Sequence, residues 1–317
     1  MKNSAAIIAS CSGLALTQAE RRLFSTTNPL GFILFARNCE TPDQIRALVA
    51  DLRESVGWEC PILIDQEGGR VQRLKPPYWT QHKPANACTG DEACTIAHSI
   101  AQDLTALKID VNCAPVMDLL YPETHDVIGD RAYSDDPCAV YETGLAVAQS
   151  YLDAGVLPIN KHIPGHGRAI SDSHLELPVI DTKLEELERT DFYPFRKFAA
   201  HELANYTWGM VAHIIYQALD PDLAASVSST TMNYIRHEMG CDQFLLADDI
   251  SMKALDGYGN LADRALKTLA AGCDATLYCA GILEEMEQIL PGCPQLTAQS
   301  MDRYERSRQY IRRRPAA

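Results

Sequence analysis

Short apolar runs recur along the chain, and each is followed by a segment in which apolar residues repeat with a helical period. Short apolar runs between turn residues are typical of buried strands, and the longer repeat is typical of helices. The predicted strands are Ala5–Ser10, Gly31–Phe35, Pro61–Asp65, Ile109–Ala114, Val156–Lys161, Trp208–His213, Gln243–Asp248 and Asp274–Cys279. The predicted helices are Gln18–Leu23, Thr41–Val56, Glu92–Leu107, Pro137–Ala154, Thr182–Leu203, Ser229–Met239, Leu261–Ala271 and about Thr297–Arg312.

Capping signals mark the ends of several predicted helices. Two residue pairs have the spacing of a capping box, and two glycines stand where a helix should end. The pairs are Thr41 with Gln44 and Thr182 with Glu185, and the glycines are Gly155 and Gly272.

Strands that alternate with helices favour an α/β fold, and specifically a single-domain (β/α)₈ TIM-type barrel over residues 1–317. A doubly wound open sheet has the same alternation. Polar residues at the predicted strand ends favour the barrel, because a barrel gathers all these ends at one face and an open sheet spreads them along a crevice. These residues are Asp65, Asn112, Asp118, Lys161, His162, His213 and Asp248. We expect residues 75–90 to form a long loop at the same face.

Composition narrows the possible partners. Hydrophobic residues make up 46% of the chain and charged residues 22%, which is typical of a globular protein. The net charge of −14 argues against nucleic acid or an anionic membrane as the main partner. The eleven cysteines have no C-x-x-C spacing, so we expect reduced thiols and a cytoplasmic protein. The N-terminal apolar run could be a signal peptide, but residues 10–12 interrupt it without a clean cleavage site, so we interpret it as a strand.

The densest motif, Lys-His-Ile-Pro-Gly-His-Gly, spans residues 161–167 and continues to His174. Lys161 and His162 stand at the end of a predicted strand, and the proline and glycines that follow break regular structure. In an extended segment Asp172 and His174 face the same way, so the carboxylate can orient the imidazole and raise its basicity. The alternative is a loop with surface histidines, but three of the nine histidines fall within thirteen residues here. That density favours a functional site.

A second motif, Asp-Gln-Glu-Gly-Gly-Arg-Val-Gln-Arg, runs from Asp65 at a strand end to Arg73. A carboxylate and a guanidinium together match the vicinal hydroxyl groups of a sugar. Arg131 is a further candidate sugar ligand, with Asp130 as its expected partner. The alternative, which applies most to Arg70, is a salt-bridge network under the barrel rim.

A third motif consists of four apolar residues followed by two adjacent carboxylates, Asp248 and Asp249. Because successive strand side chains point in opposite directions, only one should face the barrel mouth. A lone carboxylate at a strand end is what a glycosidase nucleophile requires, so we favour Asp248. Asp249 is the expected N-cap of the next helix. His213, at another strand end, either shapes the pocket or satisfies polar groups at the rim.

Taken together, these motifs resemble glycoside hydrolase family 3, and more narrowly its single-domain bacterial β-N-acetylglucosaminidases (β-hexosaminidases) of peptidoglycan recycling. The resemblance runs in the same order from about Gly31 to Cys279. Its motifs are residues 31–38, 65–73, 127–131, 161–167, 172–174, 212–213 and 248–252. Ile163 replaces the aromatic residue that is usual in the Lys-His-Phe motif.

The resemblance implies a retaining exo-β-N-acetylglucosaminidase that acts on cytoplasmic peptidoglycan fragments (N-acetylglucosamine-anhydro-muropeptides), with no cofactor and no metal. Asp248 would be the nucleophile, and His174, paired with Asp172, the general acid/base. The terminal sugar would be held by Asp65, Arg73, Arg131, Lys161 and His162. A histidine acid departs from the usual two carboxylates, but its ordinary pKa of about 6.5 suits the role. We expect a carbohydrate substrate, no nucleic-acid or membrane partner, and a monomer.

Three other classes of protein remain open at this point. A metal-dependent barrel hydrolase commonly begins with a pair of histidines on its first strand, but here that strand ends in residues of other kinds. A β-glycoside phosphorylase could use the same residues, because a histidine acid/base does not repel phosphate as a carboxylate does. A non-catalytic sugar-binding barrel would need neither Asp248 nor the Asp172–His174 pair.

Overall fold

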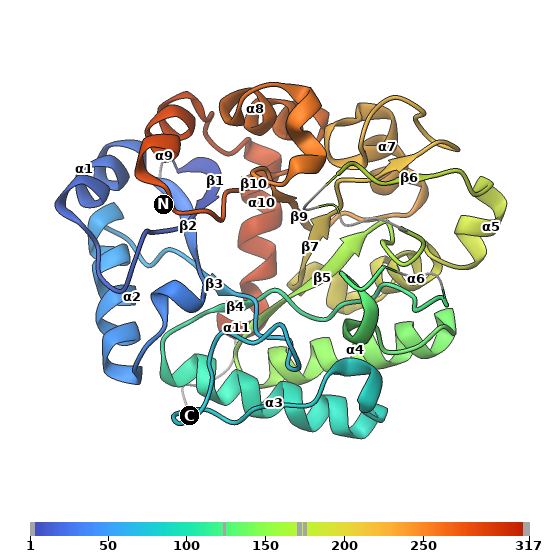
Figure 1. Cartoon of the computed structure of the whole chain (residues 1–317), viewed down its shortest axis with the longest axis horizontal. Helices are drawn as coiled ribbons and strands as arrows, with labels where there is room; N and C mark the ends of the chain where they lie inside the picture. Colours follow the sequence, from blue (N-terminus) through green and yellow to red (C-terminus); the bar gives the residue numbers. More distant parts are fainter. Residues whose placement is uncertain (1–3, 123–124, 170–172, 174–175, 313–317) are drawn as a thin grey trace.

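A closed barrel of eight parallel strands forms the centre of the molecule (Figure 1). The structure is a computed structural model and describes residues 4–122, 125–169, 173 and 176–312. The barrel strands lie in the order β1-β10-β9-β7-β5-β4-β3-β2. They are β1 (Ala5–Ala9), β2 (Pro29–Leu34), β3 (Ile62–Ile64), β4 (Val111–Asn112), β5 (Leu157–Ile163), β7 (Trp208–Val211), β9 (Phe244–Asp249) and β10 (Ala275–Leu277). The barrel prediction and its eight strands are confirmed, and the doubly wound alternative is wrong.

Helices follow the strands and surround the barrel (Figure 1). They are α1 (Gln18–Thr27), α2 (Pro42–Val56), α3 (Gly90–Ala106), α4 (Pro137–Asp153), α5 (Leu184–Arg189), α6 (Tyr193–Ala199), α7 (Ser229–Asn233), α8 (Leu261–Ala271), α9 (Leu283–Ile289), α10 (Ala298–Ser307) and α11 (Gln309–Arg312). A separate parallel pair, β6 (Val179–Ile180) and β8 (Ile215–Tyr216), lies outside the barrel sheet. Among the described residues, no helix combines the length and apolar character needed to cross a membrane.

Two expectations about the helices need correction, and one helix was not expected. The helix predicted over Thr182–Leu203 is broken, because Pro194 has no N–H to donate and fits only the first turn of α6. The N-cap of α5 is Lys183, one residue later than the predicted Thr182. Helix α9 was not predicted, because its seven residues are too few for a helical repeat to show. By contrast, Thr41 caps α2 as predicted.

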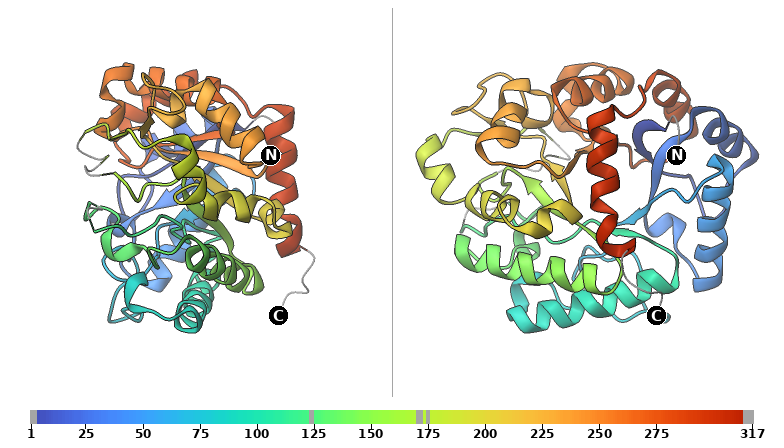
Figure 2. Two further views of the ribbon diagram at one scale, coloured as in Figure 1. Left: turned by 90° about the vertical axis from the view of Figure 1, so that its right-hand side faces the viewer. Right: turned by 180° about the vertical axis from the view of Figure 1, so that it is seen from behind.

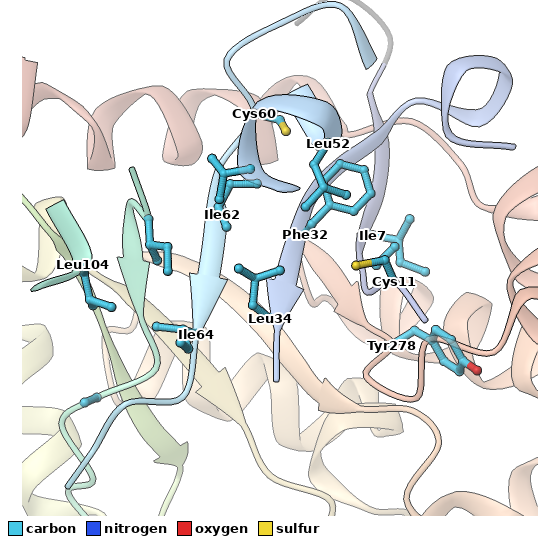
Figure 3. Close-up of a cluster of buried hydrophobic side chains, with 14 of the residues drawn as sticks. Ile7, Cys11, Phe32, Leu34, Leu52, Cys60, Ile62, Ile64, Leu104 and Tyr278 are labelled. Carbon is cyan, nitrogen blue, oxygen red and sulfur yellow. The ribbon is translucent and has the colours of Figure 1, made fainter. Parts of the chain in front are cut away.

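The barrel wall separates an inner apolar layer from an outer one. Ile8 points into the barrel, whereas Ile7 points outward toward the helices. In β3, Leu63 lies inside, and Ile62 and Ile64 lie outside (Figure 3). The inner layer comprises Ile8, Leu30, Ile33, Leu63, Val111, Cys113, Leu157, Ile159, Trp208, Met210, Phe244, Leu246, Ala275, Leu277 and Tyr304. The barrel interior is therefore a packed core, as the period-two pattern of strands requires.

Helix α10 covers the amino-terminal end of the barrel, where it runs across the back of the molecule (Figure 2). Its Tyr304 is fully buried against Trp208 and Phe244, the first residues of β7 and β9. The Trp208 Nε1–H donates a hydrogen bond of 2.8 Å to Ser307 Oγ. Side chains of α10, β7 and β9 therefore pack together at this end of the barrel, whereas the active sites of (β/α)₈ barrels lie at the carboxyl end.

Two strands shift register near their carboxyl ends. Lys161 and Ile163 of β5 pair with consecutive residues of β7, so His162 is an extra residue in β5. Leu246 and Asp249 of β9, three positions apart, pair with residues only two positions apart in β10. An extra residue bends the strand and re-aims its side chains. Both shifts fall where the sequence predicts functional residues.

Candidate active site

A cavity opens at the carboxyl ends of the barrel strands. It contains about 620 Å³ of space, part of it open to solvent, which is within the usual size of a small-molecule site. It is lined by Phe35, Asp65, Glu67, Val71, Arg73, Arg131, Lys161, His162, Met210, Asp248, Asp249, Leu277 and Cys279. The cavity therefore includes every predicted site residue that the structure describes.

Six of the lining side chains form a network that we call the charged cluster: Asp65, Glu67, Arg73, Arg131, Lys161 and His162. Lys161 Nζ lies 2.8 Å from Asp65 Oδ1 and 2.7 Å from Glu67 Oε1. Glu67 also binds Arg131 through both of its oxygens, each at 2.8 Å. The second oxygen of Asp65 lies 3.3 Å from Arg73 Nη2. Because Lys161 and Glu67 are almost completely buried, solvent screens these pairs little.

Alternating charges keep the cluster ionised. Burial acts to raise the pKa of Asp65, but Lys161 and Arg73 outweigh it and hold that pKa well below its ordinary range. Burial acts in the same direction on Glu67, but Arg131 and Lys161 lower its pKa to about 2. For Lys161, burial acts to lower the pKa, whereas Asp65 and Glu67 raise it above its ordinary value. The result is a fixed set of charged donors and acceptors, which suits the neutral hydroxyl groups of a sugar.

The segment from Asp65 to Arg73 is held in place by buried amides. Gln66 Oε1 accepts a hydrogen bond of 2.7 Å from the backbone N–H of Arg73. Asn112 at the end of β4 binds both the backbone N–H and the carbonyl of Gln66. Gly68 has a φ of +101°, and a Cβ there would lie 2.7 Å from a carbonyl oxygen of the loop at residues 75–90. Asn112, one of the predicted strand-end residues, therefore supports the motif from outside the cavity.

His162 is oriented by a buried carboxylate, Asp118. Asp118 Oδ2 lies 2.6 Å from His162 Nδ1, and Oδ1 accepts the backbone N–H groups of His162 and His166 at 3.2 and 2.7 Å. Because the carboxylate accepts, Nδ1 carries the proton and Nε2 is left on the side of Arg131, 3.5 Å from its Nη2. Burial acts to raise the pKa of Asp118, but His162 lowers it below the ordinary value. The register shift in β5 explains how the adjacent Lys161 and His162 can both line the cavity.

Asp248 and Asp249 both line the cavity, which corrects the prediction that only one would do so. The register shift in β9 interrupts the alternation on which that prediction depended. Asp249 accepts hydrogen bonds from the backbone N–H of Ser251 at 3.0 Å, from Ser251 Oγ at 2.6 Å and from the backbone N–H of Cys279 at 3.2 Å. It fixes the turn after β9 and is not the predicted helix N-cap, since the next 3₁₀ segment begins after Met252. Asp248 accepts the backbone N–H of Asp249 at 2.8 Å.

His213 supports β9 from the neighbouring strand end. Its Nε2 lies 3.1 Å from the carbonyl oxygen of Asp249, and its Nδ1 lies 2.7 Å from Ser226 Oγ. A carbonyl only accepts, so Nε2 carries the proton and Nδ1 accepts from the hydroxyl. Burial lowers the pKa of His213, so the ring is neutral at pH 7. Of the two interpretations of this residue, the geometry favours the one in which it satisfies polar groups at the rim.

The predicted acid/base pair, Asp172 and His174, lies outside the described residues. We call residues 164–176 the β5 loop, of which the structure describes 164–169, 173 and 176. The carbonyl oxygen of Gly165 accepts a hydrogen bond of 2.6 Å from Tyr216 Oη. A Cβ on Gly167 would lie 2.3 Å from a backbone carbonyl oxygen in the segment after β4. The glycines of the motif therefore allow the loop to pack directly against neighbouring backbone.

Some site residues differ from the sequence prediction. The partner of Arg131 is Glu67 and not Asp130, whose Oδ1 instead lies 2.7 Å from Arg70 Nε. Arg70 thus belongs to a rim salt bridge, the alternative considered for it. Sequence reasoning missed Glu67 as a site residue, although in an extended segment it faces the same way as Asp65 two positions earlier. In the part of the chain that the structure describes, no group of three His, Cys, Asp or Glu side chains is arranged to hold a metal ion.

Comparison with known proteins identifies the family. Residues 8–310 match the family described as "Glycosyl hydrolase family 3 N terminal domain". The chain belongs to glycoside hydrolase family 3. A β-hexosaminidase from Photobacterium profundum is 33% identical over 295 residues, covering 92% of this chain and 86% of that protein. One from Tolumonas auensis is 36% identical over 273 residues, covering 84% of this chain and 80% of that protein.

Solved structures agree with the sequence relatives. NagZ from Neisseria gonorrhoeae, in complex with N-trifluoroacetyl-D-glucosamine, has a TM-score of 0.84 at 27% identity and covers 98% of this chain and 93% of its own. A family 3 β-N-acetylglucosaminidase from Paenibacillus sp. has a TM-score of 0.88 at 29% identity, and this chain spans 62% of that protein. The predicted family is confirmed, and so is the prediction of a glycoside hydrolase of the β-N-acetylhexosaminidase type.

Proposed function

We propose that this family 3 enzyme is a retaining exo-β-N-acetylglucosaminidase that forms a covalent glycosyl-enzyme on Asp248. The observation that carries the proposal is that Asp248 lines the same cavity as the charged cluster. The neighbouring Asp249, by contrast, accepts hydrogen bonds from Ser251 in the turn after β9. The similar NagZ structure with N-trifluoroacetyl-D-glucosamine supports an N-acylated glucosamine as the bound sugar.

In the proposed first step, an Asp248 oxygen attacks the anomeric carbon while the bond from that carbon to the leaving-group oxygen breaks. His174 gives its proton to the leaving-group oxygen, and Asp172 orients the imidazole ring and stabilises its imidazolium form. In the second step, His174 takes a proton from water, whose oxygen replaces Asp248 on the anomeric carbon. Two displacements at one carbon give net retention.

The remaining predicted residues would hold the terminal sugar. Asp65 and the three cationic side chains offer fixed acceptors and donors around one end of the cavity, and His162 presents Nε2 beside Arg131. The packed barrel core beneath them closes the inner end of the cavity, which supports exo cleavage. The cluster residues that we propose to bind the sugar are Asp65, Arg73, Arg131, Lys161 and His162.

We propose the biological substrate from the family resemblance: β-linked N-acetylglucosamine at the non-reducing end of peptidoglycan fragments in the cytoplasm. We also propose that the enzyme is a monomer with a single domain over residues 1–317. All eleven cysteines are free thiols in the structure, which supports a reducing compartment. Hydrolysis of aryl glycosides that carry N-acetylglucosamine, glucose or N-acetylgalactosamine tests the choice of sugar. We expect the first to be preferred.

Covalent labelling tests the mechanism. A slowly released fluorinated N-acetylglucosaminide should attach to Asp248, as peptide mass analysis would show. A label on Asp249 or Glu67 would overturn the assignment.

Product analysis with and without inorganic phosphate separates hydrolysis from phosphorolysis, and we expect the free sugar in both cases. A mimic of the cyclised acetamido intermediate should bind more weakly than a flattened hydroximolactone-type mimic, because the enzyme carboxylate and not the substrate attacks.

A further inference from the structure

Ser173 is held by two hydrogen bonds, one to the start of the β5 loop and one to the segment that follows β9. Its Oγ lies 3.1 Å from His166 Nε2, and its carbonyl oxygen accepts the backbone N–H of Ala254 at 3.2 Å. Both Ser173 and His166 are buried, with 2% and 3% of their surface exposed. Ala254 belongs to the 3₁₀ segment Lys253–Tyr258, which follows the turn after β9. Ser173 therefore lies between the strand that carries the predicted nucleophile and the start of its own loop.

The His166 ring makes a single hydrogen bond among the described residues. Its Nδ1 is buried and has no hydrogen-bond partner in the described part of the chain, so the contact with Ser173 is the only described hydrogen bond of the ring. Burial, together with the nearby His162, lowers the pKa of His166 to about 4, so the ring is neutral at pH 7. A neutral imidazole away from the lining of the cavity is suited to hold another residue in place rather than to exchange protons with a substrate.

The same histidine is tied to the sugar-binding side of the site. The backbone N–H of His166 donates to Asp118 Oδ1 at 2.7 Å, and the other oxygen of that carboxylate orients His162. The rings of His162 and His166 meet edge to face, with centroids 5.6 Å apart. One buried carboxylate thus fixes both a predicted sugar ligand and the residue that holds Ser173.

We propose that His166 and Ser173 are positioning residues for acid catalysis. Ser173 is the residue that joins Asp172 to His174 in the chain, so its bond with His166 restrains the residue between the two members of the predicted pair. The inference rests on the proposed function of His174 as the acid/base. Neither His166 nor Ser173 exchanges a proton with the substrate in this scheme.

The chain offers a matched control at the other side of the barrel mouth. His213 and Ser226 form a second buried histidine–serine hydrogen bond, of 2.7 Å, but this pair holds the backbone of Asp249 beside the predicted nucleophile. Removing the Ser226 hydroxyl should disturb the attack of the nucleophile, a step that substrates with good and poor leaving groups both require. Removing the Ser173 hydroxyl disturbs proton donation, which matters mainly for a poor leaving group.

The test compares Ser173→Ala, Ser226→Ala, His166→Gln and the double variant Ser173→Ala/His166→Gln on two N-acetylglucosaminides, a dinitrophenyl glycoside and a disaccharide. Loss of one hydrogen bond of about 1 kcal/mol corresponds to about a fivefold to tenfold effect. We expect Ser173→Ala to slow the disaccharide about tenfold in kcat and the dinitrophenyl glycoside less than about twofold, whereas Ser226→Ala slows both alike. Because the two residues act through one bond, the double variant should be no slower than the slower single variant.

Equal losses on both substrates for Ser173→Ala, or no loss on either, would overturn the proposal, as would additive effects in the double variant. His174→Ala serves as the reference. If it shows the leaving-group dependence and Ser173→Ala does not, only the positioning role is wrong. If His174→Ala itself shows no such dependence, the acid assignment fails and the positioning role fails with it. Thermal unfolding of each variant identifies folding losses, and should Ser173→Ala not fold, His166→Gln alone decides by the same ratio of rates.

Discussion

The charged cluster and the β5 loop serve the same predicted reaction but are held in different ways. In the cluster, Lys161 extends from a barrel strand and is fixed by buried ion pairs of 2.7 and 2.8 Å. In the β5 loop, an ion pair of 2.7 Å between Arg168 and Asp191 holds the first half. Ser173, which stands between the two members of the predicted acid/base pair, is anchored only by its hydrogen bonds with His166 and Ala254 among the described contacts. The difference predicts that sugar binding depends on the barrel strands, whereas acid catalysis depends on a few contacts of one loop. The two functions should therefore be separable by mutation.

The largest effect should come from the strand that carries the predicted nucleophile, Asp248. Asp248→Asn removes the attacking oxygen charge, so we expect kcat to fall by about four orders of magnitude or more on every substrate. Asp249→Asn, which weakens the turn after β9, should cost about tenfold to a hundredfold. Steady-state kinetics with a dinitrophenyl N-acetylglucosaminide measures both. Comparable losses in the two variants would contradict the assignment of Asp248.

The next effect belongs to the β5 loop and should depend on the substrate. His174→Ala removes the predicted proton donor, so cleavage of a disaccharide should fall by about two to four orders of magnitude. An activated nitrophenyl glycoside needs little protonation and should lose much less. Asp172→Asn should behave as a weaker version, because the imidazole remains but is poorly oriented. Equal losses on both substrates would mean that the acid lies elsewhere.

A cluster variant should show the opposite behaviour. Glu67→Gln leaves Lys161 and Arg131 with one less buried counter-charge, so both side chains lose their fixed positions. We expect kcat/KM to fall by about tenfold to a hundredfold, and by the same factor for good and poor leaving groups. A matched change at the rim, Asp130→Asn, removes only the half-exposed pair with Arg70 and should have little effect. A leaving-group dependence in Glu67→Gln would break the separation between cluster and loop.

The cluster also makes a prediction about pH and stability. The pKa of Glu67 is lowered from its ordinary value of 4.5 to about 2, so its charge contributes stability above about pH 4.5, and this contribution is lost as the pH falls toward 2. The shift corresponds to about 3 kcal/mol. Glu67→Gln should therefore be less stable than the wild type at pH 6, and the difference should shrink as the pH falls through this window. Urea unfolding at several pH values measures it, and a difference that is constant with pH would show that folding does not lower the pKa of Glu67.

The sequence predicted the barrel well because strand periodicity and the polar strand ends are local signals. It placed Asp65, Lys161 and Asp248 at one cavity for the same reason. It failed where three-dimensional pairing decides the outcome. Nothing local shows that Arg131 pairs with Glu67, 64 positions away, rather than with the adjacent Asp130. The rule of alternating side chains also failed at the end of β9, because a register shift against β10 cannot be seen in one strand alone.

The smallest predicted effect on the reaction comes from a variant at the opposite, amino-terminal end of the barrel. It sharpens the comparison between cluster and loop because it changes neither of them. Trp208 Nε1–H donates to Ser307 Oγ, and both residues are fully buried between β7 and α10. In Ser307→Ala the indole N–H keeps its burial but loses its acceptor, which costs about 1 to 3 kcal/mol of unfolding free energy. The ratio of disaccharide to dinitrophenyl cleavage should not change, because both the charged cluster and the β5 loop lie at the carboxyl end of the strands. Denaturant unfolding combined with the two-substrate assay checks this. A changed ratio in Ser307→Ala would mean that any loss of stability alters the acid step, and the ratio could then no longer be attributed to the anchors of the loop.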